Sequence, residues 1–243
     1  MQHALNQEVV SAIRAKGHTA YSYTCDITNW QAVQTLKTEI AANCPQDVTY
    51  IINNAGIVQG KPWLELSPEQ IERTLKVNTL SQFYITKTFL PSMIAADHGH
   101  VVNVASVAGI FVIQNLTDYC ASKFASIGFS QCLQQEFAGT NLHCTVICPS
   151  HTLSGMFDGL YMRFQSFMPS LTTEQVVDRA ILAVRENKDF LVTPPVFYYL
   201  QLLAGVVPKP FVDKICQFLG TANCMNNFNG HVNNEYTGDN KEK

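Results

Sequence analysis

The chain alternates between short apolar runs and longer segments in which apolar residues recur at helical spacing. The runs at residues 48–52, 101–104 and 142–148 are largely apolar on both faces, which is typical of buried strands in a parallel sheet. Shorter strands are predicted at residues 19–24 and 190–193. Helices are predicted at residues 4–16, 29–43, 68–94, 118–138 and 173–186.

This order of strands and helices predicts an α/β fold with a doubly wound parallel sheet, because each crossover helix packs on one face of the sheet. Capping boxes at Ser67 and Thr172, each followed three residues later by Gln, support the starts of two of the helices. A length of 243 residues fits one domain. We place this domain at residues 1–230 and expect a polar, disordered tail at residues 231–243.

The composition excludes several classes of function. A net charge of −3 provides no basic field for nucleic acid. The eight cysteines are scattered without a CxxC pair, and no acidic or thiol ligands lie beside His98 and His100, so neither a disulfide framework nor a metal site is expected. No uninterrupted apolar run is long enough to predict a membrane-spanning helix. Residues 190–219 are apolar but broken by prolines, and they either lie on a membrane surface or close the fold.

The candidate chemistry is concentrated between Ser106 and Lys123. Tyr119 and Lys123 are four residues apart in a predicted helix, so they share one face. A phenol has an ordinary pKa of about 10, and an ammonium group one turn away favours the phenolate. Ser106 precedes Tyr119 by thirteen residues and offers a hydroxyl to the oxygen that gains or loses the proton. This set suits the oxidation of an alcohol or the reduction of a carbonyl.

Two further motifs accompany these residues. Asn53-Asn54-Ala55-Gly56 follows the predicted strand 48–52, and Asn78 lies inside the predicted helix 68–94. In this order and spacing the NNAG turn, the helical Asn, the Ser and the YxxxK motif resemble the short-chain dehydrogenase/reductase family, which has a Rossmann-like fold. The resemblance covers nearly the whole chain from about Thr19. Phrases such as YTCDIT, NNAGIV and DYCASKFA are similar to the branch that contains epidermal retinol dehydrogenases and 17-beta-hydroxysteroid dehydrogenase types 11 and 13.

The resemblance implies a role for each catalytic residue. Tyr119 is expected to act as general acid and base, and Lys123 to bind the nicotinamide ribose and lower the pKa of Tyr119. Ser106 is expected to orient the substrate oxygen, and the backbone of Asn78 to hold a water in the proton relay. The implied cofactor is NAD or NADP.

Cofactor contacts follow from the same resemblance. The implied residues are Asp26, Ile27, Asn53, Ala55, Gly56, Tyr119, Lys123, Pro149 and Ser154. The carboxylate of Asp26 is expected to accept a hydrogen bond from the adenine amino group. Its alternative role is to cap the N-terminus of the helix at residues 29–43. Pro149 matches a Pro-Gly turn of the family in which Ser150 replaces the Gly, and Ser154 keeps a hydroxyl for the cofactor carboxamide.

The segment at residues 153–171 is rich in Met and aromatic residues and stands where the family has its substrate lid. We expect it either to line a pocket for a long apolar molecule or to form an ordinary amphipathic helix on the core. The first alternative, together with the resemblance, predicts an oxidoreductase that interconverts a lipophilic alcohol, retinol-like or hydroxysteroid-like, and its carbonyl.

One family feature is missing from the sequence. No TGxxxGxG turn is present, since the first glycine is Gly17 and the next is Gly56. That turn presents backbone N–H groups to the cofactor pyrophosphate. We therefore expect an N-terminally truncated form of a dehydrogenase, with weak or no cofactor binding. We also expect the strand at residues 48–52 to be an exposed edge.

An alternative function is a catalytically silent product that acts as a dimerising or lipid-droplet-associated partner of a full-length enzyme. The helices at residues 68–94 and 118–138 resemble those that form the family's homodimer interface. The expected location is the cytosol-facing surface of the endoplasmic reticulum membrane or of a lipid droplet. The cytoplasm is expected instead if a missing N-terminal segment carried the anchor.

Overall fold

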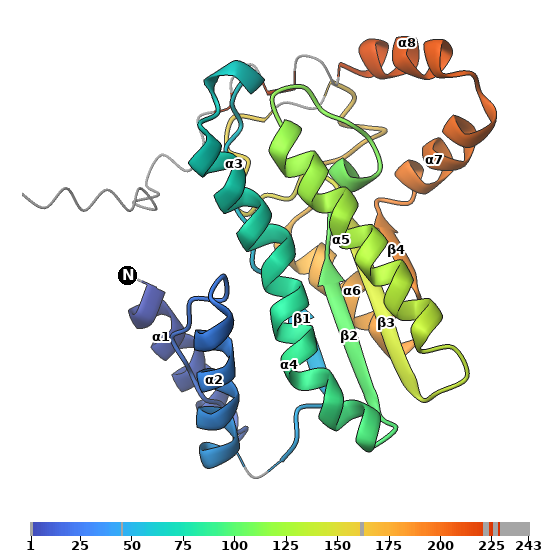
Figure 1. The fold of residues 1–243 in the computed structure, drawn as a ribbon. Helices are drawn as coiled ribbons and strands as arrows, with labels where there is room; N and C mark the ends of the chain where they lie inside the picture. Colours follow the sequence, from blue (N-terminus) through green and yellow to red (C-terminus); the bar gives the residue numbers. More distant parts are fainter. Residues whose placement is uncertain (1, 45, 161–162, 221–223, 226–227, 229–243) are drawn as a thin grey trace, which may run out of the picture.

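A computed structural model describes residues 2–44, 46–160, 163–220, 224–225 and 228, and it forms an α/β fold (Figure 1). Four strands are present in the described residues: β1 (Tyr50–Asn53), β2 (Gly99–Val104), β3 (Leu142–Pro149) and β4 (Phe190–Thr193). The α-helices are α1 (Gln2–Ala15), α2 (Trp30–Asn43), α3 (Pro68–Leu75), α4 (Ser81–Ala95), α5 (Thr117–Glu136), α6 (Thr173–Arg185), α7 (Val196–Val206) and α8 (Lys209–Leu219). Short helical turns η1 (Trp63–Glu65), η2 (Lys76–Leu80) and η3 (Val107–Gly109) complete the set.

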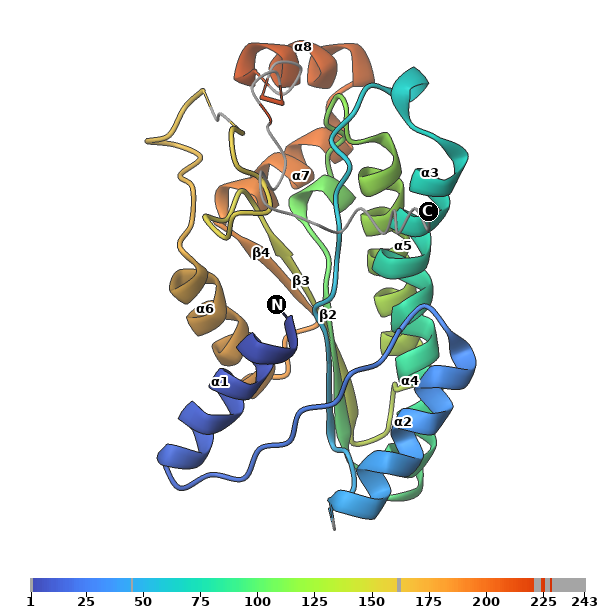
Figure 2. The same cartoon turned by 90° about the vertical axis from the view of Figure 1, so that its left-hand side faces the viewer.

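The strands form one parallel sheet in the order β1-β2-β3-β4. Figure 2 shows the sheet between two helical layers, with α2, α4 and α5 on one face and α1 and α6 on the other. Helices α7 and α8 lie beyond the carboxyl ends of the strands (Figure 1). This arrangement confirms the predicted doubly wound, Rossmann-like α/β fold.

Apolar side chains from the strands and helices fill the space on both sides of the sheet. Between the sheet and helices α4 and α5, Met93 and Phe89 pack on Val101 and Cys144. Towards α7, a second cluster joins strand residue Val146 to Phe197 and other side chains. Val101 and Val146 are fully buried, as expected of parallel strands covered on both faces.

Several predicted elements form with small changes. The capping boxes at Ser67 and Thr172 are both present. The long helix predicted at residues 68–94 is interrupted by a π-helical turn, η2, which carries Asn78. Such turns shift the helix register by one residue and often occur at functional sites.

Two predictions for other segments are wrong. The strand predicted at residues 19–24 does not form, because an extended segment becomes a strand only where a neighbour supplies a hydrogen-bond ladder. The amphipathic helix considered for residues 153–171 is also absent from their described part, which consists of turns and a β-bridge between Thr152 and Leu171.

The predicted tail at residues 231–243 lies outside the described residues. No helix in the described part of the chain is both long and apolar enough to cross a bilayer.

Strand β1 is one of the two edge strands of the sheet in the described residues, and the sequence predicts it to be an exposed edge. Its side chains alternate, with Ile51 4% exposed and Ile52 67% exposed. Tyr50 on the same outer side is 55% exposed. An exposed β-branched and aromatic edge favours pairing with another chain.

We expect Ile52→Lys to reduce aggregation while changing the free energy of unfolding by no more than about 0.5 kcal/mol, since the side chain is exposed and a charge disfavours edge pairing. The matched control is Ile51→Lys, one residue away, which buries a charge and should destabilise the fold by roughly 3 kcal/mol or more. Light scattering and urea unfolding measure the two effects. Equal aggregation of wild type and Ile52→Lys would contradict the role of this edge.

Candidate active site

The predicted catalytic residues meet where β2 ends and α5 begins. Tyr119 and Lys123 lie in the first two turns of α5, one turn apart. Ser106 lies two residues after the end of β2 and caps η3, where its Oγ accepts a hydrogen bond from the Ala108 N–H at 3.1 Å. Gly109 allows this turn to rest on α5, because a Cβ there would lie 2.7 Å from the carbonyl oxygen of Lys123. The close approach brings Ser106 beside Tyr119.

Tyr119 is buried, with 4% of its surface exposed. Burial raises the pKa of its phenol above the ordinary value, and a hydrogen bond with the Ser106 side chain acts in the opposite direction. The Nζ atom of Lys123 lies 5.6 Å from the centre of the tyrosine ring. In the protein alone, the loss of solvation on burial is the largest influence on the pKa of Tyr119. The expected lowering of this pKa by Lys123 stays a prediction. In this state the phenol is held as a proton donor.

Lys123 is 3% exposed and its Nζ donates a hydrogen bond of 2.8 Å to the carbonyl oxygen of Val104, the last residue of β2. Burial lowers the pKa of this ammonium group to about 8. An ammonium group has three N–H donors. One of them is held by Val104, which leaves donors for a bound molecule in the adjoining site.

Asn78 is fully buried in η2 and holds the loop after β1 in place. Its Oδ1 accepts from the Ile57 N–H at 2.8 Å, and its Nδ2 donates to the Ile57 carbonyl at 2.9 Å and to the Ser122 hydroxyl at 3.0 Å. Its own carbonyl accepts from the Ser126 hydroxyl at 3.3 Å. Asn78 thus joins three segments of the site through its side chain, a role that the helical position alone does not reveal.

The NNAG turn lies against this cluster. A Cβ at Gly56 would lie 3.5 Å from Oδ1 of Asn78 and 3.6 Å from Nζ of Lys123. Ile27, Asn53 and Ala55 line one pocket at the open side of β1. The side chain of Asn53 turns into the protein, where its Nδ2 donates to Asn103 Oδ1 at 2.7 Å. Any contact from Asn53 to a cofactor would therefore come from its backbone.

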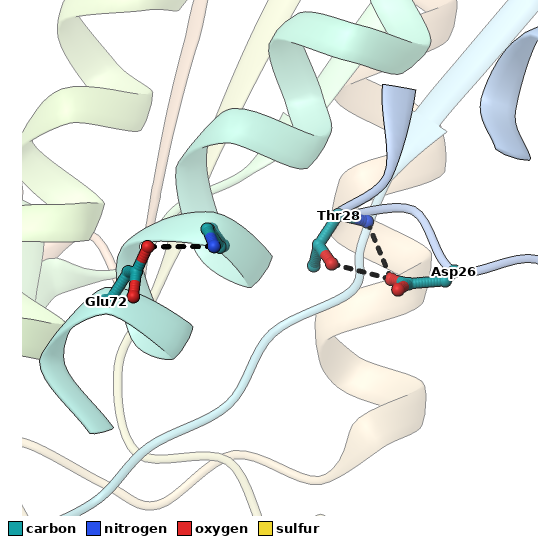
Figure 3. A network of polar contacts seen from close by, with 4 residues as sticks. Asp26, Thr28 and Glu72 are labelled. Carbon is teal, nitrogen blue, oxygen red and sulfur yellow. Dashed lines mark hydrogen bonds and ion pairs between the residues drawn. The ribbon is translucent and has the colours of Figure 1, made fainter. Parts of the chain in front are cut away.

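Asp26 is exposed in the loop that precedes α2, and Figure 3 shows its carboxylate turned towards Thr28. Its Oδ1 accepts from the Thr28 N–H at 2.9 Å and from the Thr28 hydroxyl at 2.7 Å. The N-cap of α2 is Asn29, so the alternative role of Asp26 as this cap is wrong. Neither hydrogen bond uses the second carboxylate oxygen, Oδ2, which can still accept a hydrogen bond from an amino group.

Of the predicted site residues at the end of β3 and after it, some lie at the site and one does not. The Pro149 carbonyl accepts from the Ser106 hydroxyl at 3.5 Å, which brings the end of β3 against the site. Ser150, which stands where the family pattern has Gly, is accommodated without a positive φ. Ser154 is exposed in a turn and lines neither of the two pockets at the site. The structure therefore does not bring Ser154 to the other predicted residues.

An apolar pocket opens next to Ser106. The predicted lid contributes Phe157, Leu160 and Met168, which supports the pocket alternative for this segment. Most of the opposite wall comes from α7 and α8, whose lining residues include Phe197, Leu200, Leu203 and Ile215. Sequence reasoning did not assign these helices to the pocket. The signal was the charge-free run VFYYLQLLAGV, which is equally consistent with a membrane-surface helix.

The donor set fits parts of a nicotinamide dinucleotide. Lys123 offers N–H donors beside the small residues Ala55 and Gly56, while Ile27 provides an apolar surface in the neighbouring pocket. For the pyrophosphate, the sequence contains no glycine-rich turn. The residues present thus match the ribose and the adenine better than the phosphates.

The sheet and the Ser-Tyr-Lys cluster at its carboxyl ends define the class of protein, a Rossmann-like dehydrogenase scaffold. A model of the short chain dehydrogenase family matches residues 2–162. The chain belongs to this family.

Among curated relatives, retinol dehydrogenase 10-B of Danio rerio is 36% identical over 210 residues, covering 84% of this chain and 62% of that protein. Epidermal retinol dehydrogenase 2 of Homo sapiens is 34% identical over 227 residues, covering 92% of this chain and 73% of the relative. The chain thus spans about three fifths of the retinol dehydrogenase 10 relatives.

Solved structures share the fold. A short chain dehydrogenase/reductase from Burkholderia phymatum, crystallised in complex with NAD, superposes with a TM-score of 0.72 at 22% identity, covering 84% of this chain and 81% of the other. Serine dehydrogenase from Escherichia coli gives a TM-score of 0.60 at 26% identity, with 71% and 75% covered.

The buried Lys123 predicts a pH dependence of stability. Below about pH 8 the lysine is protonated in both states, but between this value and its ordinary pKa of 10.5 the unfolded chain keeps a proton that the folded chain has lost. The free energy of unfolding of the wild type should therefore rise with pH relative to that of Lys123→Met. The expected rise is about 2 kcal/mol between roughly pH 7.5 and 9.5, at 1.36 kcal/mol per pH unit. Urea unfolding of both proteins across this range measures the difference. A constant difference would show that Lys123 keeps an ordinary pKa.

Proposed function

We propose that this protein is an NAD- or NADP-dependent oxidoreductase that interconverts a lipophilic alcohol and its carbonyl. The observation that carries the proposal is the position of Ser106. Its hydroxyl interacts with buried Tyr119 and also lines the apolar pocket. Groups suited to proton transfer therefore face a space suited to a lipophilic molecule.

Each residue of the cluster has a chemical task. The Tyr119 hydroxyl gives its proton to a carbonyl oxygen during reduction and takes it from an alcohol during oxidation. Ser106 orients that oxygen, and Lys123, held by Val104, supports the phenolate and offers N–H donors to a ribose. Asn78 holds the loop that carries Gly56 against Lys123. When bound, the nicotinamide accepts or supplies the hydride.

The substrate class follows from the pocket and from the relatives. Apart from Ser106, Ser150, His151 and Cys224, the pocket is lined by apolar side chains and a glycine. The curated relatives are named retinol dehydrogenases. A retinol-like or hydroxysteroid-like alcohol fits both facts, whereas a small polar alcohol would leave the apolar walls unfilled.

Association with a lipid surface is part of the proposal. The exposed side of α7 and α8 carries Tyr199, Val206, Phe211 and Phe218, each at least 60% exposed. The inner sides of the same helices line the pocket. A peripheral contact with an endoplasmic reticulum membrane or a lipid droplet would bury these residues and let a lipophilic substrate enter without crossing water. Exposed Phe83 on α4 and Phe124 on α5 favour a homodimer through these two helices.

A second candidate function is a catalytically silent partner of a longer dehydrogenase. Two observations favour it: the open, apolar edge of β1 and the lack of a glycine-rich turn. Residues 1–243 expressed alone should bind the cofactor several powers of ten more weakly than a chain that carries such a turn, at roughly 1.5–3 kcal/mol for each charge-assisted hydrogen bond. Activity should therefore be sought at millimolar cofactor.

The experiment that tests the proposal compares retinol with ethanol at about millimolar NAD or NADP, with nucleotide reduction as the readout. We expect turnover with retinol to exceed turnover with ethanol by about a hundredfold or more, because burial of the long apolar chain contributes roughly 0.8 kcal/mol per methylene. A preference for ethanol would contradict the substrate class. Cofactor binding without turnover of either alcohol would favour the silent partner.

We expect Tyr119→Phe to lower turnover by about 10²–10⁴-fold, since the substitution removes the proton-transfer hydroxyl and keeps the ring. The affinity for NADH should change little, because the hydroxyl supplies little of the binding energy. The matched control is Tyr199→Phe, at a tyrosine that is 67% exposed, which should leave turnover unchanged. Turnover of Tyr119→Phe within tenfold of the wild type would remove Tyr119 from this role.

A further inference from the structure

The apolar pocket has a small polar corner formed by Ser106, Ser150 and His151. Two of these side chains are already engaged. Ser106 accepts from Ala108 and donates to the Pro149 carbonyl. His151 Nδ1 lies 2.9 Å from the Ser170 hydroxyl, and burial lowers the pKa of the imidazole, so it is neutral at physiological pH.

The Ser150 hydroxyl differs from both neighbours. Ser150 is 8% exposed, and none of the residues that the structure describes forms a hydrogen bond with its buried Oγ. Burying an unpaired hydroxyl costs free energy, so a buried polar group without a protein partner in a pocket wall indicates a partner in the bound molecule.

The backbone fixes where this hydroxyl lies. The Ser150 N–H donates to the Thr193 carbonyl at 2.8 Å, and the Ser150 carbonyl accepts from the Thr152 hydroxyl at 3.0 Å. Ser106 Oγ lies 3.5 Å from the Pro149 carbonyl, the group bonded to the Ser150 nitrogen. Ser150 and Ser106 are therefore held next to each other at the same end of the pocket, although they are 44 residues apart in the sequence.

We propose that Ser150 is a substrate-binding residue whose hydroxyl forms a hydrogen bond with the oxygen of a lipophilic alcohol or carbonyl in this pocket. A serine hydroxyl both donates and accepts, so it can pair with either form of the substrate. The remaining walls are apolar, so the pocket selects a molecule with one polar end. The inference rests on the proposed function, because it assumes that the substrate occupies the apolar pocket.

The test is binding of all-trans-retinol and of anhydroretinol, its hydrocarbon analogue without the hydroxyl, measured by energy transfer from tryptophan. The wild type should bind retinol more tightly than anhydroretinol, and about tenfold of this preference is expected from the one hydrogen bond of Ser150. Ser150→Ala should therefore show a preference about tenfold smaller than that of the wild type, the remainder coming from Ser106 and Tyr119, while binding anhydroretinol as well as the wild type does. A preference in Ser150→Ala equal to that of the wild type would overturn the assignment and leave the proposed function standing.

Thermal unfolding without ligand separates this role from a structural one. Removing an unpaired buried hydroxyl should leave the Tm of Ser150→Ala equal to or above that of the wild type. The matched control is Ser130→Ala. Ser130 is fully buried, accepts from Asn103 at 2.9 Å and donates to Ser126 at 2.7 Å, so its loss should lower the Tm and keep the retinol preference.

A Tm of Ser150→Ala lowered as much as that of Ser130→Ala would show that the hydroxyl has a protein partner, which overturns the assignment. A wild type that binds neither retinoid would overturn the proposed substrate class, and the assignment of Ser150 with it. The binding result thus distinguishes failure of the proposed function from failure of the role of Ser150.

Discussion

The paired hydrogen bonds between the Asn78 side chain and the backbone of Ile57 are the interaction on which the site depends. The side-chain amide satisfies both the N–H and the carbonyl of one residue in the loop after β1. Its third bond, to Ser122, ties that loop to α5, one residue before Lys123. Because Asn78 is fully buried, loss of the amide would leave several polar groups unpaired in the interior. The position of the loop relative to the catalytic helix is therefore strongly determined.

Burial has opposite consequences for the two titratable groups of the site. It favours the neutral form of both groups, so it raises the pKa of Tyr119 and lowers the pKa of Lys123, and the two values move apart. The Val104 carbonyl compensates part of the cost of burying the ammonium group. A second positive charge or an oxyanion beside these residues would shift the balance towards proton transfer. In the protein alone, the phenol of Tyr119 is neutral and can donate its proton.

The pocket and the proton-transfer groups come from different parts of the fold. Ser106 comes shortly after the carboxyl end of β2, and Tyr119 lies in the first turn of α5, which packs on the sheet. The pocket walls come from turns after β3 and from α7 and α8, which pack beyond the sheet (Figure 1). This division is common in α/β proteins, because loops at the carboxyl ends of strands vary without disturbing the core. It explains how one set of catalytic groups can serve a lipophilic substrate here.

The sequence by itself determined the α/β class, most elements and the Ser-Tyr-Lys cluster. Local periodicity, the capping boxes and the one-turn spacing of Tyr119 and Lys123 act over a few residues, so they can be read along the chain. Only the tertiary structure decided how burial shifts the tyrosine pKa, that residues 19–24 form no strand, and that α7 lines the pocket. It also decided that Asp26 bonds Thr28 and that the Ser150 hydroxyl is left unpaired. These properties depend on which distant residues come into contact and on how much water they exclude, and neither follows from local spacing.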